Sequence, residues 1–409
     1  MRCLLCRFFF ICNPLLSLRR GRYYDGGREL LAKETQINNI AQTSAVDYRI
    51  TLSETWIIKA VAIIAMLVHH LFLDHSEFGD SIVRIGLAGK VCITLFVFLS
   101  GYGMAASFPK KDSKGFVLAK NFFFVLCKRC AKFFMNYWFV FSVFVPIGVF
   151  CFGRPLEAAY GTNVNLLKSF ISDMLGQQGL FSYNATWWFN AVILALWVMF
   201  PFLYLAMKNK IVSICVLVFL FIDPYVVMRV FHSIAFGLAS YILPFALGIF
   251  IALRIDWINK VLNKVHPYVV LCVSLTVAPF LFFLRGYPLF PNFTGFSVDP
   301  FATLFLALAV VSLCRVTQCK FAFVQFVGKH SMNMYLTHTF IFAYFFPGII
   351  YGFEYPILIF VALFASSLLL SVCIEFIKNR IGFYKLQGKV VGVINRAGGL
   401  VPKEHDNAH

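Results

Sequence analysis

The stretch WIIKAVAIIAMLVHHLF, residues 56–72, decides the fold class of this chain. It is apolar except for one lysine and two histidines, and with Leu73 it reaches 18 residues. A helix of that length can cross the hydrocarbon core of a bilayer, which is about 30 Å thick. Comparable apolar runs recur as far as Phe376. The sequence therefore predicts an all-α, polytopic membrane bundle.

The composition supports this class. Hydrophobic residues make up 60% of the 409 residues and charged residues only 13%, whereas soluble chains carry roughly a quarter. A soluble enzyme, a secreted disulfide scaffold and a disordered chain are excluded. The 12 cysteines lie mostly inside apolar runs, where cysteine acts as a small hydrophobe. The pairs Cys3/Cys6 and Cys127/Cys130 have zinc-like spacing but no matching second pair, so we expect neither a metal site nor a disulfide framework.

The basic residues predict the topology. We expect about ten spans, at 56–73, 89–107, 133–152, 187–206, 211–228, 232–252, 268–284, 298–314, 333–350 and 356–377. The two ends and every second connection then hold 29 of the Lys and Arg residues, while the other connections, counted with Lys90 at the start of the second span, hold 6. By the positive-inside rule both termini are cytoplasmic, in a multi-pass protein of the inner (plasma) membrane. We attribute the net charge of +18 to this topology and to contact with the lipid bilayer, and not to nucleic acid.

The chain divides into three parts. Residues 1–55 form a basic polar cytoplasmic leader without a signal-peptide cleavage site. This leader is either an interfacial segment or an extension from a misplaced start. Residues 56–377 form the membrane domain, and residues 378–409 form a short basic cytoplasmic tail.

The first span carries the ionisable residues Lys59, His69 and His70, and such residues inside a membrane are candidates for function. Lys59 and His70 are eleven positions apart, so they share one helical face at an axial separation of about 16 Å. His69 points elsewhere. The simpler interpretation of Lys59 is a lysine whose side chain reaches the membrane interface. The simpler interpretation of the two histidines is a helix end near the outer surface. Neutral histidine is suited to accept an alcohol proton near pH 7, and burial favours that neutral form.

Five motifs occur in order between residues 55 and 380. They are the Lys59–His70 pair, LFVFLSGYG at 95–103, RCAKFFMNYW at 129–138, NATWWF at 184–189 followed by Pro201, and GKHSMNMYLTH at 328–338. Together they resemble the acyltransferase 3 family of integral membrane acyltransferases. The chain departs from that pattern in having a lysine where the family has an arginine in the first motif, and a methionine for a proline in the third.

The resemblance implies a membrane O-acyltransferase, a transferase of groups other than aminoacyl groups. Its donor would be an acyl-coenzyme A, with acetyl-coenzyme A as the expected co-substrate and no tightly bound cofactor. Its acceptor would be a hydroxyl of a cell-envelope or surface carbohydrate. The implied site residues are His70, Lys59 and His69 for catalysis, Arg129 and Lys132 for the donor, and Asn184, Trp187, Trp188, His338 and Tyr335 for the substrate.

Several of these roles have alternatives. Arg129 and Lys132 also fit plain positive-inside topology, and His338 fits a packed histidine equally well. Whether His70 is a general base or carries the acyl group stays open, as do the acceptor's identity and the oligomeric state. Ser100-Gly101 fits close helix packing better than a nucleophile.

A transporter or flippase for a glycan or small solute is the alternative function. A transport path usually has acidic or paired charges in several spans, and we expect only Glu375 near the end of one. A glycan polymerase would need a larger outer loop than 153–186.

Overall fold

The computed structural model describes residues 45–108, 115–177, 182–230, 235–286 and 294–398. Every regular element in these ranges is helical, which confirms the all-α class. The α-helices are α2 (Leu52–Phe72), α3 (Asp80–Ala88), α4 (Cys92–Ser107), α5 (Gly115–Cys151), α6 (Leu156–Tyr160), α7 (Leu166–Met174), α8 (Trp188–Lys208), α9 (Lys210–Val230), α10 (Ala235–Leu262), α11 (Pro267–Gly286), α12 (Thr294–Thr317), α13 (Ala322–Thr339), α14 (Pro347–Tyr351), α15 (Pro356–Arg380) and α16 (Phe383–Gly398). Short 3-10 turns η1 (Ser76–Phe78), η2 (Gly89–Val91) and η3 (Ala185–Trp187) and a π-helix η4 (Phe340–Phe345) connect some of them.

Eight helical stretches in the described residues are long and apolar enough to cross a membrane. They are Leu52–Phe72, Asp80–Ser107, Val117–Cys151, Ala185–Lys208, Ser240–Leu262, Pro267–Arg285, Val298–Thr317 and Pro356–Arg380. The polytopic bundle is therefore confirmed. The predicted spans 211–228 and 333–350 coincide with a shorter apolar stretch, Lys210–Ile222 in α9, and with a region divided among α13, η4 and α14.

Two predicted connections are largely helical. α5 begins at Gly115 and runs for 37 residues, so it includes most of the predicted basic connection 108–132. α13 begins at Ala322, inside the predicted connection 315–332. The physical reason is that Lys and Arg are good helix formers. Charge can therefore mark where a helix leaves the membrane without marking where the helix ends.

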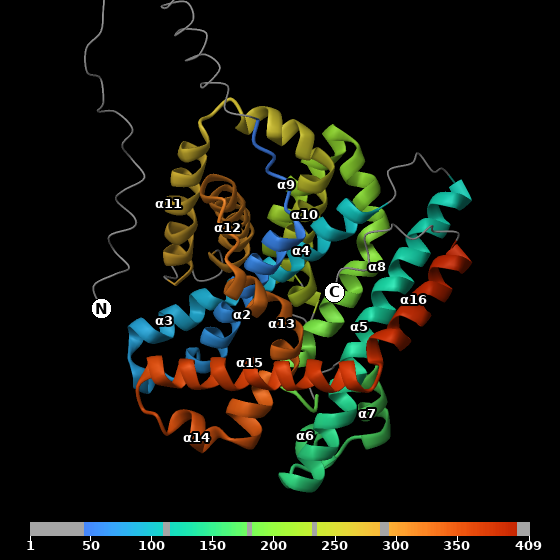
Figure 1. Cartoon of the computed structure of the whole chain (residues 1–409), viewed down its shortest axis with the longest axis vertical. Helices are drawn as coiled ribbons and strands as arrows, with labels where there is room; N and C mark the ends of the chain where they lie inside the picture. The colour runs from blue at the N-terminus through green and yellow to red at the C-terminus, as the bar shows by residue number, and fades with distance from the viewer. Residues whose placement is uncertain (1–44, 109–114, 178–181, 231–234, 287–293, 399–409) are drawn as a thin grey trace, which may run out of the picture. The chain divides into compact units, whose positions relative to one another are not determined.

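The predicted tail 378–409 contains α16, which packs along α5 (Figure 1). Phe383 and Val391 of α16 are buried. At Gly398 an added Cβ would lie 2.8 Å from Cγ of Phe124 on α5, so the two helices touch there. The segment is thus a packed helix up to Gly398, and residues 399–409 lie outside the described residues.

The first 44 residues of the predicted leader also lie outside the described residues. α2 begins directly after Thr51, which forms a capping box with Glu54. The buried carboxylate of Glu54 pairs with Nη1 of Arg315 at 2.5 Å, so the start of α2 is tied to the end of α12. The sequence Thr51-x-x-Glu54 is a recognised helix-start signature. It places the start of the first span a few residues before 56.

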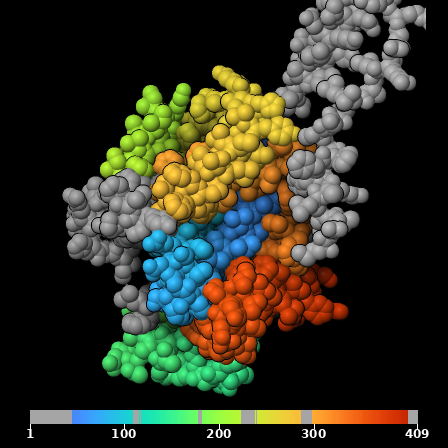
Figure 2. Space-filling model, turned by 90° about the vertical axis from the view of Figure 1, so that its left-hand side faces the viewer, coloured from blue at the N-terminus to red at the C-terminus, as the bar shows by residue number. Residues whose placement is uncertain are grey.

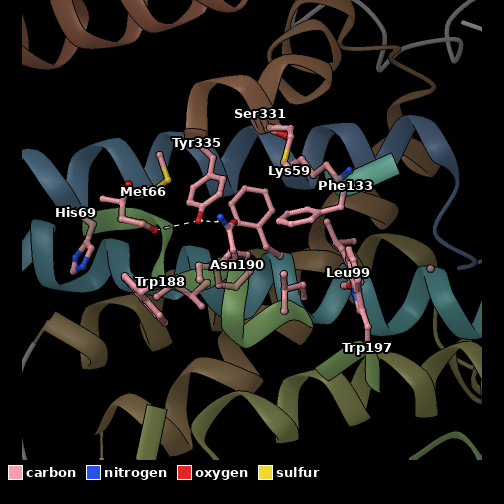
Figure 3. A pocket seen from close by; sticks show the side chains of 18 of the residues that line it. Lys59, Met66, His69, Leu99, Phe133, Trp188, Asn190, Trp197, Ser331 and Tyr335 are labelled. Atoms are coloured by element: carbon pink, nitrogen blue, oxygen red, sulfur yellow. Dashed lines mark hydrogen bonds between the residues drawn. The ribbon is translucent and has the colours of Figure 1, made fainter. Parts of the chain in front are cut away.

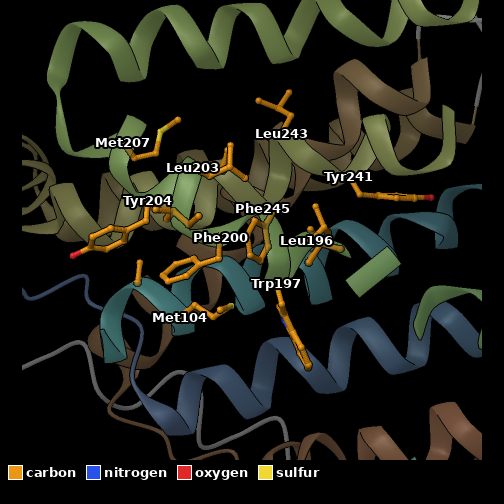
Figure 4. Packing of buried hydrophobic residues seen from close by; sticks show 14 of the residues in the cluster. Met104, Leu196, Trp197, Phe200, Leu203, Tyr204, Met207, Tyr241, Leu243 and Phe245 are labelled. Carbon is orange, nitrogen blue, oxygen red and sulfur yellow. The ribbon is translucent and has the colours of Figure 1, made fainter. Parts of the chain in front are cut away.

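Two motif glycines lie where helices touch. A Cβ on Gly101 of α4 would lie 2.2 Å from the carbonyl oxygen of Phe245 on α10. A Cβ on Gly328 of α13 would lie 1.8 Å from the carbonyl oxygen of Trp56 on α2. No larger residue fits at either position without moving a helix, which supports the packing interpretation of Ser100-Gly101. Large aromatic side chains fill the space between α4, α8 and α10 beside the first contact (Figure 4).

α2, which carries the candidate catalytic residues, lies inside this bundle. It contacts α3, α4, α13 and α15, which surround it in Figure 1. Figure 2 views the face made by α3, α11 and α15, with α2 visible between them. The ionisable residues of α2 are therefore held among protein side chains, where a binding site can be built.

Candidate active site

A cavity of about 520 Å³ lies beside α2, lined by side chains of α2, α4, α5, α8 and α13 and of the turns η2 and η3. Along α2 it extends from Thr55 to His70. Fifteen residues of helix are about 22 Å long, so the cavity is elongated along α2. Figure 3 shows Lys59 and His69 toward opposite ends of it. Lys59 and His70 both line the cavity, as the predicted shared face requires.

The charge on the cavity wall has one sign. Three charged residues line it, Lys59, Lys90 and Arg129, and no Asp or Glu is among its described lining residues. The middle of the cavity is lined by apolar and aromatic side chains such as Met66 and Phe189. An elongated apolar channel with basic residues at its ends is suited to a ligand with an apolar centre and anionic groups.

The first end of the cavity holds two cations close together. Lys59 and Arg129 interact electrostatically, and neither forms an ion pair with a described residue. The Arg129 guanidinium carbon lies 6.0 Å from the ring centre of Trp197, whose Nε1 donates to Oγ of Ser100 at 2.8 Å. Two like charges without a protein counterion are costly to hold in a largely apolar site. Their arrangement favours a bound polyanion.

Lys132 does not belong to this end. Its side chain is exposed and is not among those that line the cavity. Arg129 and Lys132 are three residues apart on α5, so both sit on neighbouring faces of the helix, but only Arg129 points inward. The structure therefore brings one of the two predicted donor residues to the cavity.

Three histidines cluster at the second end, and two of them, His69 and His70, line the cavity. The ring centre of His70 lies 5.1 Å from that of His69 and 5.2 Å from that of His338. Nδ1 of His69 lies 2.8 Å from the carbonyl oxygen of Gly86 on α3, so this nitrogen carries a proton and donates it. His70 lines the cavity and forms no hydrogen bond with a described residue. His70 therefore has its ring nitrogens available to a ligand, whereas Nδ1 of His69 is bonded to Gly86.

His338 lies behind His70 and does not line the cavity. It is fully buried, and its Nδ1 lies 2.9 Å and 3.2 Å from the carbonyl oxygens of Tyr335 and Met334. Carbonyls only accept, so Nδ1 is the protonated nitrogen and Nε2 faces the hydroxyl of Thr339 at 3.3 Å. The ring is fixed in one orientation and buttresses the His70 ring.

The candidate substrate residues of the fourth motif divide into two groups. Trp188 lines the cavity, whereas Asn184 and Trp187 do not. Asn184 caps η3 by accepting from the amide and hydroxyl of Thr186. The Trp187 ring is fully buried, and its Nε1 donates to the carbonyl oxygen of Leu336 at 3.1 Å. Asn184 and Trp187 therefore lie outside the cavity: Oδ1 of Asn184 caps η3, and the indole of Trp187 joins η3 to α13.

Tyr335 does line the cavity. Its hydroxyl lies 3.1 Å from the carbonyl oxygen of Thr186 and 3.1 Å from Oδ1 of Asn190, as the dashed lines of Figure 3 show. These contacts join α13 to η3 and α8 at the cavity wall. Asn190 has a buried Nδ2 without a hydrogen-bond partner. Tyr335 and Asn190 therefore form a polar patch in the cavity wall.

Sequence reasoning missed several cavity residues, including Asn190, Ser331, Trp197 and Lys90. Ser331 lies inside the fifth motif, and its spacing from His338 on the same helix could have indicated it as a candidate site residue. Single uncharged polar residues in apolar spans, such as Asn190, carry little signal by themselves. Their role depends on which face of the helix meets the cavity.

The expectation that Glu375 is the one acid in the spans was wrong. Asp299 is buried in the stretch Val298–Thr317, and its Oδ1 lies 2.8 Å from Nε of Arg285. Glu54 is also buried, at the start of α2. Each of these acids pairs with an arginine, which is how a buried carboxylate is tolerated. In the part of the chain that the structure describes, no group of three or more His, Cys, Asp or Glu side chains could hold a metal ion.

Comparison with known proteins gives one family. The model described as "Acyltransferase domain" of the acyltransferase 3 family matches residues 56–376, which includes every cavity-lining element except the N-terminal edge of α2. Neither a search of curated proteins nor a search of solved structures finds a match.

Proposed function

The chain belongs to the acyltransferase 3 family and is a multi-pass membrane acyltransferase, and we propose that it transfers an acyl group, acetyl in the first instance, from acyl-coenzyme A to a hydroxyl of a cell-envelope or surface carbohydrate. The observation that carries this proposal is the cavity along α2, with unpaired cations at one end and His70 at the other. A coenzyme A thioester has the matching design, with phosphates and thioester at opposite ends of a long arm.

Lys59 and Arg129 bind the donor phosphates in this proposal. Arg129 offers a planar fork of donors that fits a phosphate, and Lys59 adds a point charge. The eleven residues from Lys59 to His70 span about 16 Å, so the thioester can lie at His70 while the phosphates stay near Lys59. Between them the arm crosses the apolar part of the cavity.

His70 acts as the general base. Its neutral ring accepts the proton of the acceptor hydroxyl as the oxygen attacks the thioester carbonyl carbon. The new C–O bond forms, the C–S bond breaks, and the imidazolium returns the proton to the departing thiolate. The products are an ester and free coenzyme A. His338 holds the His70 ring in place through their 5.2 Å ring contact.

The acceptor enters at the His70 end. Trp188 provides an aromatic face for a sugar ring, and Tyr335 with Asn190 provides polar groups for its hydroxyls. With α2 running outward from a cytoplasmic N-terminus, as the charge distribution predicts, the donor is held from the cytoplasm and the acceptor is presented from the outer side of the inner membrane.

Sealed vesicles of the two orientations test this direction. Labelled acetyl-coenzyme A supplied only to the cytoplasmic face should label the glycan in vesicles that contain the protein, and His70→Ala vesicles should stay unlabelled. Labelling that appears only when the donor reaches the outer face would refute the proposed direction. Vesicles with His70→Ala that label as well as wild type would refute the role of His70.

A further inference from the structure

Among the described residues that line the cavity, Lys90 is the charged one that the proposed reaction does not use. Lys59 and Arg129 serve the donor, whereas Lys90 lines the cavity near the histidine end. Its ammonium forms no ion pair or hydrogen bond with a described residue. A half-buried ammonium without a counterion is unfavourable, so the position of Lys90 at the cavity wall needs a physical explanation.

The local sequence fixes Lys90 beside α2. Gly86 and Gly89 both touch the last turns of that helix. The carbonyl oxygen of Gly86 accepts from Nδ1 of His69, and a Cβ on Gly89 would lie 2.5 Å from the carbonyl oxygen of Ala65. The turn η2 is therefore pressed against α2, and Lys90, which follows Gly89, is held close to the histidines.

The charges around Lys90 do not neutralise it. It interacts electrostatically with Arg285 and Asp299, but Asp299 is already paired with Arg285 at 2.8 Å. His69 also interacts with Lys90 and Arg285, and it adds no negative charge. Two cations thus face one carboxylate, and one positive charge remains at the cavity wall.

A donor bound as proposed cannot supply the missing anion. Lys59 and His69 are ten residues apart, about 15 Å along α2. When the phosphates lie at Lys59 and Arg129 and the thioester lies at His70, no donor phosphate reaches Lys90. An anion at Lys90 must come from the other substrate.

We propose that Lys90 binds an anionic group of the acceptor, so that the preferred carbohydrate is an acidic one, bearing a carboxylate or a phosphate near the hydroxyl that is acylated. This inference rests on the proposed function for the identity of the acceptor. The anion site itself is open to a direct binding measurement that needs no acyl transfer.

The test compares three matched probes on the purified full-length protein: methyl glucoside, methyl glucuronide and methyl glucoside 6-phosphate. Binding is followed by the fluorescence of tryptophan, since Trp188 lines the same cavity. A charge-assisted hydrogen bond predicts that wild type binds the better anionic probe about 10- to 100-fold more tightly than the neutral one. Lys90→Gln should lose this preference and Lys90→Arg should keep it. The control Arg84→Gln removes an exposed cation of α3 outside the cavity and should also keep it.

Each outcome supports or overturns the proposed anion site at Lys90. A preference that depends on Lys90 supports the proposal, and the tighter of the two anionic probes identifies the group as carboxylate or phosphate. Equal or undetectable binding of all three probes to wild type overturns it, as does a preference that survives in Lys90→Gln. A Lys90-dependent preference without acyl transfer from acetyl-coenzyme A to any acceptor would refute the proposed function and leave the anion site standing.

Discussion

Replacing Arg129 by glutamine removes one of the two cations assigned to the donor phosphates. A hydrogen bond to a charged group contributes about 1.5–3 kcal/mol, which corresponds to a change of about 10- to 150-fold in affinity. Because Arg129 lies at the opposite end of the cavity from His70, the loss should appear in KM for acetyl-coenzyme A, with a much smaller effect on kcat. Arg129→Lys should recover part of it, since lysine keeps the charge but not the planar fork.

The matched control is Lys132→Gln, which removes an exposed cation of the same helix three residues away. It should leave KM for acetyl-coenzyme A nearly unchanged. A second comparison uses S-acetylpantetheine, a donor without phosphates. Arg129→Gln should lower activity with acetyl-coenzyme A and not with this shorter donor. Equal KM changes for Arg129→Gln and Lys132→Gln, or an equal loss with both donors, would refute phosphate binding by Arg129.

Two further predictions concern the fold. Gly328→Ala should markedly lower the Tm of the purified protein, because its Cβ would lie 1.8 Å from the carbonyl oxygen of Trp56. The control is Gly388→Ala on α16, where no atom lies within 4 Å of the added Cβ. An equal Tm for the two variants would contradict the close contact of α13 with α2. In a chain without native cysteines, Lys260→Cys should react with an impermeant thiol reagent only from the cytoplasm and Lys168→Cys only from outside, since both positions are exposed and lie on opposite sides of the predicted topology. The reverse pattern would show that the topology is inverted.

Apolar run length and helix periodicity were enough to predict the helical membrane bundle and the shared face of Lys59 and His70. The sequence could not separate Trp187 from Trp188 because both are aromatic residues at the same helix start. Their difference comes from the hydrogen bond of Trp187 to Leu336, a residue 149 positions away. Lys132 and Arg129 were equivalent as charges, and only the packing of α5 turns one of them to the cavity. In the sequence Lys90 is only one of the charges that indicate topology, because its place beside α2 depends on the glycine contacts of η2.

If His70 is the base of the acyl transfer, as proposed, its loss must slow the reaction far more than the loss of its neighbour His69. Purified wild type, His70→Ala and His69→Ala are reconstituted in equal amounts, and the rate of acetyl transfer from acetyl-coenzyme A to the glycan is measured. Loss of a general base predicts a fall of about 10²–10⁴-fold for His70→Ala, with a milder loss for His69→Ala, whose native side chain is bonded to Gly86. Equal rates for the two variants at equal amounts of membrane-inserted protein would show that His70 is not the general base.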